Sequence, residues 1–181
     1  MMTVRAIRAI DEPTYLDILD RTSGDDRYYR FFRAVDHFDH ADVARFVEPA
    51  PGVVGMISLE GSRGLGVAHA FVTVDSAEIA LVVAADSQRR GVGRLLIEAL
   101  FGKLRELGVA TVTAVSLWEN LGFAALARSF GMVATHAPGD GSVVHWSLLL
   151  ETTKPLAPQG HATMLLWPAA LATEASNAPA A

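Results

Sequence analysis

Hydrophobic and polar positions along this chain follow two different periods. Strand-like runs, alternating or continuously apolar, are bounded by glycine-rich or polar turns. They cover residues 4–10, 53–59, 66–74, 78–84, 111–116 and 143–150. Runs with apolar residues three and four positions apart predict helices after Asp11 and over 39–46, 95–107 and 121–130.

Start and stop signals support these boundaries. Asp11 is placed to cap a helix with Pro13 in its first turn, and residues 22–26 give a further break and helix start. Gly108 is suited to end the helix over 95–107. Because that helix separates strands 78–84 and 111–116, we expect these two strands to be parallel neighbours.

The other strands predict antiparallel pairing. Strands 53–59 and 66–74 flank a short turn at 61–64, which is hairpin spacing. A turn at 138–141 leads into strand 143–150, which we expect to be the last strand of a closing antiparallel pair.

The most informative segment joins strand 78–84 to the helix that follows. It reads Gln88-Arg89-Arg90-Gly91-Val92-Gly93-Arg94. The first N–H groups of a helix have no intrahelical partner, and the helix dipole adds positive potential there. Glycines let an anion approach the backbone, and arginines add charge and forked donors. The turn therefore predicts a site for phosphate or pyrophosphate.

Two common phosphate motifs do not fit this turn. A P-loop requires Gly-Lys-Ser/Thr, which is missing here. The dinucleotide fingerprint requires a third small residue, and Leu96 holds that place. The remaining pattern, Gln-x-x-Gly-x-Gly after a strand, resembles the GNAT superfamily of N-acetyltransferases, in which this turn holds the pyrophosphate of acetyl-coenzyme A (acetyl-CoA).

The resemblance covers roughly residues 53–150 and is strongest between Glu78 and Met132. It implies an α+β fold of three layers, in which helices flank a central twisted sheet. The sheet is expected to be mixed and mostly antiparallel, with a parallel pair at the acetyl-CoA site. The resemblance also implies main-chain contacts to the pantetheine arm from strand 78–84. The implied cofactor-binding residues are Leu81, Val82, Val83, Gln88, Arg89, Arg90, Gly91, Val92, Gly93, Arg94 and Asn120.

Glu78 is the candidate general base. It precedes the turn by one strand length, and its apolar neighbours are expected to raise its pKa by desolvation. Some protein-acetylating GNAT enzymes use a glutamate in a similar Ala-Glu-Ile context, and Ala77-Glu78-Ile79 resembles it. The alternative is a solvated glutamate near a strand start.

The resemblance leaves two site positions open. Many GNAT enzymes carry a tyrosine that protonates the leaving thiolate where this chain has Ala127. A thiol is a tolerable leaving group, so we expect no dedicated general acid. Asn120 matches a family asparagine that contacts the cofactor, but it is equally suited to cap the helix over 121–130.

Two clusters lie outside these motifs. Residues 36–42 contain several Asp and His side chains, which we interpret as a solvated face, with no metal site. Residues 27–32 read Arg-Tyr-Tyr-Arg-Phe-Phe and resemble a segment near the acceptor entrance of bacterial Pat-type protein lysine acetyltransferases. On that resemblance, Arg27, Tyr28 and Arg30 belong to the acceptor side.

Composition limits the remaining possibilities. The chain has 181 residues, 51% of them hydrophobic, and a net charge of −5, which opposes general nucleic-acid binding. Its lack of cysteine excludes disulfides and thiol catalysis. We expect one acetyltransferase domain over residues 1–150 and a poorly ordered Pro/Ala-rich tail over 151–181. We also expect no membrane span and a cytoplasmic location.

These features predict an acetyl-CoA-dependent N-acetyltransferase. The acceptor is expected to be a primary amine, such as a protein lysine, that attacks the thioester directly with Glu78 as base. One alternative is a small-molecule amine acetyltransferase. The other is a GNAT module that binds acyl-CoA without turnover, as a sensor. Acyl-chain preference and oligomeric state are not specified by the sequence.

Overall fold

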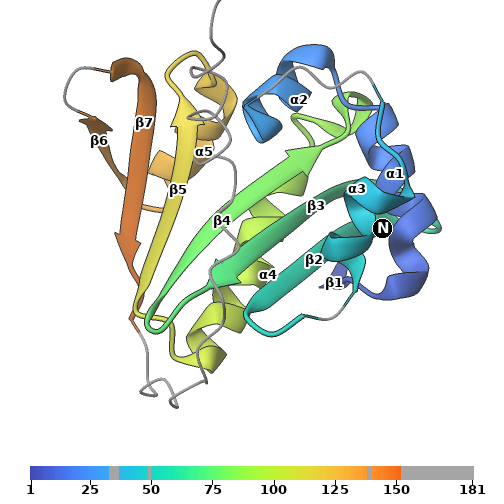
Figure 1. Ribbon diagram of the computed structural model, residues 1–181, viewed down its shortest axis with the longest axis horizontal. Helices are drawn as coiled ribbons and strands as arrows, with labels where there is room; N and C mark the ends of the chain where they lie inside the picture. Colours follow the sequence, from blue (N-terminus) through green and yellow to red (C-terminus); the bar gives the residue numbers. More distant parts are fainter. Residues whose placement is uncertain (33–36, 49, 138–139, 152–181) are drawn as a thin grey trace, which may run out of the picture.

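The computed structural model describes residues 1–32, 37–48, 50–137 and 140–151. These residues form one seven-stranded sheet with helices on both faces (Figure 1). The strands are β1 (Met2–Ala6), β2 (Val53–Glu60), β3 (Arg63–Val72), β4 (Ser76–Val83), β5 (Thr111–Leu117), β6 (Val133–Ala137) and β7 (Asp140–Leu149). The helices are α1 (Glu12–Asp20), α2 (Gly24–Phe31), α3 (His40–Val47), α4 (Val92–Leu107) and α5 (Leu121–Ser129), with short 3₁₀ turns η1 (Ala9–Asp11) and η2 (Ala85–Ser87).

The sheet is mixed, as the sequence predicts. Its strand order is β1-β2-β3-β4-β5-β7-β6, and every neighbouring pair is antiparallel except β4 and β5. The parallel ladder is short, because in the described residues it ends where Glu78 pairs with Thr113. Beyond Glu78, β4 runs on to Val83 while β5 diverges from it (Figure 1). A wedge therefore opens between the two central strands.

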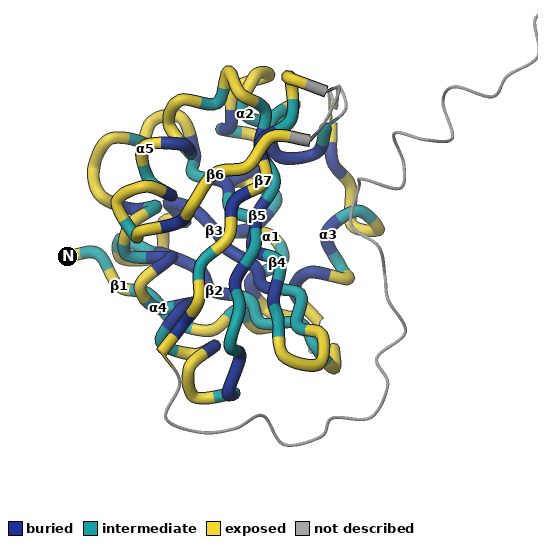
Figure 2. The backbone as a smooth tube through the Cα atoms, turned by 90° about the vertical axis from the view of Figure 1, so that its left-hand side faces the viewer, coloured by how far each residue is buried: buried dark blue, intermediate teal, exposed yellow. Residues whose placement is uncertain are grey.

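Two hydrophobic layers hold the sheet in place. On one face, α4 packs its apolar stripe, including Leu96, Leu100 and Leu104, against the central strands. On the other face, α1–α3 contribute a second cluster that includes Tyr15 and Phe46. Burial is concentrated between these layers, whereas the outer strand β6 is exposed over residues 133–136 (Figure 2).

The N-terminal region differs from the expectation in detail. The first strand ends at Ala6, and η1 follows where the alternating pattern predicted further strand. Helix α1 begins at Glu12 with Pro13 in its first turn, but Asp11 makes no side-chain cap hydrogen bond to it. Its carboxylate instead accepts hydrogen bonds from Arg5 at 2.6 Å and from the Arg8 N–H at 2.8 Å. The prediction of a side-chain cap was wrong because a bidentate arginine competes for the carboxylate.

Candidate active site

The turn between β4 and α4 is built by two residues in the left-handed region. Arg89 has φ 58° and Gly91 has φ 84°, and α4 begins directly afterwards at Val92. Left-handed backbone is unfavourable for residues with a Cβ atom, so Gly91 suits its position and Arg89 stores strain. The start of α4, at Val92–Arg94, lines a cavity in the wedge, and the first N–H groups of a helix have no intrahelical partner.

A cavity of about 300 Å³ fills this wedge. It extends from the turn to Glu78 and includes Val115 and Ser116 on the β5 side. Most of the predicted site residues line it: Glu78, Leu81, Val82, Val83, Gln88, Arg89, Gly91, Val92, Gly93, Arg94 and Asn120. The sequence motifs therefore converge on one continuous groove.

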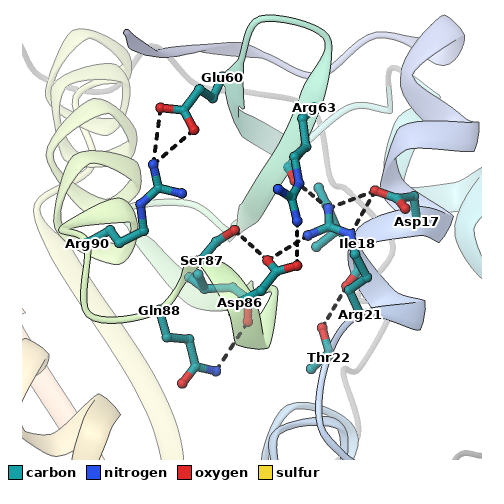
Figure 3. Close-up of polar contacts among 12 residues, drawn as sticks. Asp17, Ile18, Arg21, Thr22, Glu60, Arg63, Asp86, Ser87, Gln88 and Arg90 are labelled. Carbon is teal, nitrogen blue, oxygen red and sulfur yellow. Dashed lines mark hydrogen bonds and ion pairs between the residues drawn. The ribbon is translucent and has the colours of Figure 1, made fainter.

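Arg90 is not among the described residues that line the cavity. Its guanidinium donates to both carboxylate oxygens of Glu60, at 2.9 and 3.1 Å (Figure 3). The preceding residues of the turn are also tied to their surroundings, because Asp86 accepts hydrogen bonds from Arg21 and Arg63. The turn is thus fixed on its outer side while its inner side faces the cavity.

The groove is narrow where α4 begins. An ideal Cβ on Gly93 would lie 3.3 Å from Leu126 Cδ2 and 3.4 Å from Leu81 Cδ1. Gly93 therefore provides space between β4 and α5, which is a different role from the backbone freedom of Gly91.

Asn120 caps helix α5. Its Oδ1 accepts a hydrogen bond from the Phe123 N–H at 3.0 Å, and the residue also lines the cavity. The capping interpretation is confirmed, whereas a contact between Asn120 and a cofactor remains a prediction.

Glu78 lies at the fork where β4 and β5 separate. It is half-buried, and burial raises the pKa of its carboxyl group above the usual range. Electrostatic interactions with Arg30 and His145 act in the opposite direction on this pKa. A carboxylate at the inner end of a groove, with its pKa raised by burial, is a stronger base than an ordinary glutamate and is suited to accept a proton from a substrate.

Helix α2 also lines the cavity. Asp26, Tyr29 and Arg30 occupy positions i, i+3 and i+4, so they share one helix face, and all three line the cavity. Arg30 is buried, and burial lowers the pKa of its guanidinium to about 10. It therefore remains charged at neutral pH.

The placement of the Arg-Tyr-Tyr-Arg segment partly matches the expectation. Arg30 lines the cavity, but Arg27 and Tyr28 are outside the described lining, and Tyr28 is 45% exposed. Tyr29 was missed, although its spacing from Asp26 places both on one helix face. His145 on β7, in register with Val115, was not predicted either; it is exposed and outside the described lining, but it acts electrostatically on Glu78.

The family model described as acetyltransferase (GNAT) family matches residues 4–132 of this chain. The chain belongs to the acetyltransferase (GNAT) family. The protein is therefore an enzyme of the acetyltransferase class, and the interpretation as a sensor without turnover is not retained.

Solved structures share the fold of this GNAT acetyltransferase. The GNAT domain of PAT from S. lividans is 24% identical with a TM-score of 0.75, covering 81% of this chain and 89% of that one. The ribosomal-protein-S18-alanine N-acetyltransferase from Escherichia coli is 20% identical with a TM-score of 0.65, covering 90% and 100%. A phosphinothricin acetyltransferase from Sinorhizobium meliloti, solved in complex with AcCoA, is 19% identical with a TM-score of 0.69, covering 88% and 94%.

Ala127, which stands where the resemblance implies a tyrosine, is buried in α5. Within residues 1–32, 37–48, 50–137 and 140–151, no group of three or more His, Cys, Asp or Glu side chains could hold a metal ion. No helix in the described part of the chain is long and apolar enough to cross a membrane.

Proposed function

We propose that this enzyme transfers the acetyl group of acetyl-CoA to a primary amine, with Glu78 as general base. The observation that carries the proposal is the position of Glu78. It lies at the fork of β4 and β5, where the groove from the phosphate-binding turn meets the cavity face of α2. One side chain therefore adjoins both the donor groove and the acceptor side.

The protein groups have separate roles in this proposal. The first N–H groups of α4 and the side chains of Arg89 and Arg94 hold the pyrophosphate. The β4 backbone at Leu81–Val83 faces the wedge and is placed to pair with the pantetheine arm, as an added strand would. This arrangement directs the thioester towards Glu78.

The reaction then requires one proton transfer at the acceptor. The amine nitrogen attacks the thioester carbonyl carbon, the C–S bond breaks, and the amine proton passes to the Glu78 carboxylate directly or through water. A lysine-like amine has a pKa of about 10.4, so a base is needed to supply the neutral form near pH 7. The coenzyme A thiolate leaves and takes a proton from solvent.

A protein lysine is the acceptor that we propose. Large apolar side chains are exposed on α2 and next to Asn120: Tyr28 is 45%, Trp118 57% and Leu121 72% exposed. Exposed aromatic and aliphatic side chains beside a cavity favour contact with a protein surface over a fully enclosed small molecule.

The test measures thiol release with acetyl-CoA and a panel of lysine peptides, folded proteins and small amines. The enzyme has no cysteine, so it contributes no background thiol. Glu78→Gln should lower kcat by about 10²–10⁴-fold and leave the Kd for acetyl-CoA within about twofold. The loss should shrink at high pH, where the amine deprotonates unaided.

The matched control is Glu106→Gln, an exposed glutamate on α4 that pairs with Lys103, both outside the described lining of the groove. It should retain wild-type kcat. Wild-type kcat for Glu78→Gln at every pH would refute the role as base, and turnover confined to small amines would refute the protein acceptor.

A further inference from the structure

Gln88 begins the phosphate-binding turn, yet its side chain is bonded to a different element. Its Nε2 donates to Asp26 Oδ2 on α2 at 2.8 Å and, more weakly, to the Val83 carbonyl at 3.3 Å. Residues 26 and 88 are far apart in sequence, so this contact joins the turn to the helix on the acceptor side.

Asp26 is the central acceptor of this junction. The same oxygen that accepts from Gln88 also accepts from the Ser23 hydroxyl at 2.6 Å, and the Asp26 N–H donates to Ser23 Oγ at 3.1 Å. Ser23 is the N-cap of α2. The start of the helix and the start of the turn are therefore held by one carboxylate, through hydrogen bonds to a charged group.

Helix α2 needs such an anchor. It has eight residues, and only Arg30 and Phe31 among them are buried. A helix of this length has little stability of its own and depends on its tertiary contacts. Because Asp26, Tyr29 and Arg30 share one face, fixing Asp26 also fixes the side chains that line the cavity beside Glu78.

The turn itself is anchored independently of α2. Arg21, at the end of α1, donates to Asp86 at 2.8 Å (Figure 3). The Ala85 N–H also donates to the Arg21 carbonyl at 2.9 Å. The segment before Gln88 is thus tied to α1, and the Gln88 side chain reaches α2 from there.

We propose that Gln88 and Asp26 are positioning residues that couple the acetyl-CoA site to the acceptor site, and that the Gln88 side chain does not bind the cofactor. A ligand on the backbone of the turn restrains Gln88, Gln88 restrains α2, and α2 then presents Tyr29 and Arg30 to the acceptor. The acceptor consequently binds more tightly after the cofactor, and this coupling is reciprocal. The acceptor part rests on the proposed function.

The first experiment needs no acceptor and no turnover. Coenzyme A alone is added to the wild-type protein, and amide hydrogen exchange of residues 24–31 is followed. We expect slower exchange on α2 in wild type and no such change in Gln88→Ala or Asp26→Ala, although calorimetry still shows coenzyme A binding within about threefold of wild type.

The second experiment uses the acetylation assay. Gln88→Ala and Asp26→Ala should each raise the KM of the acceptor about tenfold, as expected for losing a hydrogen bond to a charged group. The double variant should be no worse than Asp26→Ala alone, because that substitution already removes the contact with Gln88. Asp25→Asn is the control, since Asp25 is an exposed α2 carboxylate outside the described lining.

Three results would overturn the coupling. They are loss of coenzyme A affinity in Gln88→Ala with an unchanged acceptor KM, additive effects in the double variant, or protection of α2 by coenzyme A in Gln88→Ala equal to wild type. If wild type binds coenzyme A and protects α2 but acetylates no amine, the proposed function fails while the coupling to α2 stands.

Discussion

Gly91 and Gly93 are two residues apart in the turn and serve it in different ways. Gly91 has φ 84° and open space where a Cβ would lie, so its requirement is conformational. The requirement at Gly93 is steric, because a Cβ there would lie close to the Leu126 and Leu81 side chains in the groove.

Alanine substitutions should separate these roles. Gly91→Ala should cost about 1 kcal/mol of unfolding free energy and lower the Tm by about 2–4 °C, because alanine disfavours the left-handed region. Gly93→Ala should leave the Tm closer to wild type and weaken acetyl-CoA binding about tenfold. Thermal melts and calorimetric titrations of both variants measure the two effects. A larger fall in Tm for Gly93→Ala together with a larger loss of acetyl-CoA affinity for Gly91→Ala would contradict these roles.

Single residues also mark the limit of what the sequence predicts. The motif groups Arg89 and Arg90 as equivalent phosphate ligands, but Arg90 pairs with Glu60 while Arg89 lines the cavity. The two arginine side chains take different directions because the backbone at Arg89 is left-handed, and the sequence motif does not indicate this conformation. Binding of the cofactor by Arg90 remains a prediction.

Helix α2 brings a buried positive charge close to the proposed base. The charge of Arg30 favours the carboxylate form of Glu78 and so lowers its pKa, against the larger effect of burial, which raises it. Arg30 thereby influences the pH at which the base becomes active.

Arg30→Met should shift the acidic limb of the kcat–pH profile to higher pH. Without the guanidinium charge, the pKa of Glu78 rises further, and the active carboxylate is lost sooner as the pH falls. Arg30→Lys keeps the charge and should remain close to wild type, whereas Arg27→Met, outside the described lining, should not move the limb. An unchanged limb in a folded Arg30→Met variant would remove this electrostatic role.

At the scale of elements, the order of strands and helices follows from the sequence, but the wedge does not. The helix between the strands at 78–84 and 111–116 predicts a parallel pair, and that pair is confirmed. Nothing in the apolar run of β4 indicates that pairing ends at Glu78, because Ile79–Val83 would suit a paired central strand equally well. The separation depends on how β5 and α5 pack, which is a tertiary property.

Over the whole molecule, the two hydrophobic layers explain why the groove can stay open. Successive residues of β4 point to opposite faces, so Ile79 joins the cluster under α4 and Val82 joins the cluster under α1–α3. The strand is held on both faces and by β3, and its remaining backbone edge is left for the wedge. Packing on both faces and pairing with β3 thus hold β4 in place where it has no ladder with β5.

The same organisation leads to a prediction about the C-terminal tail, which lies outside the described residues. The sheet and both core clusters are assembled from residues 2–150, and the Leu150 N–H donates to the Ala110 carbonyl at 2.8 Å where β7 ends. A protein truncated after Glu151 should therefore fold cooperatively, with a Tm within a few degrees of the full chain and an unchanged Kd for coenzyme A. Calorimetric melting and titration of both proteins provide the measurement. A large fall in Tm would show that the Met164–Trp167 segment packs on the domain, and a selective change in acceptor KM would place the tail at the acceptor side.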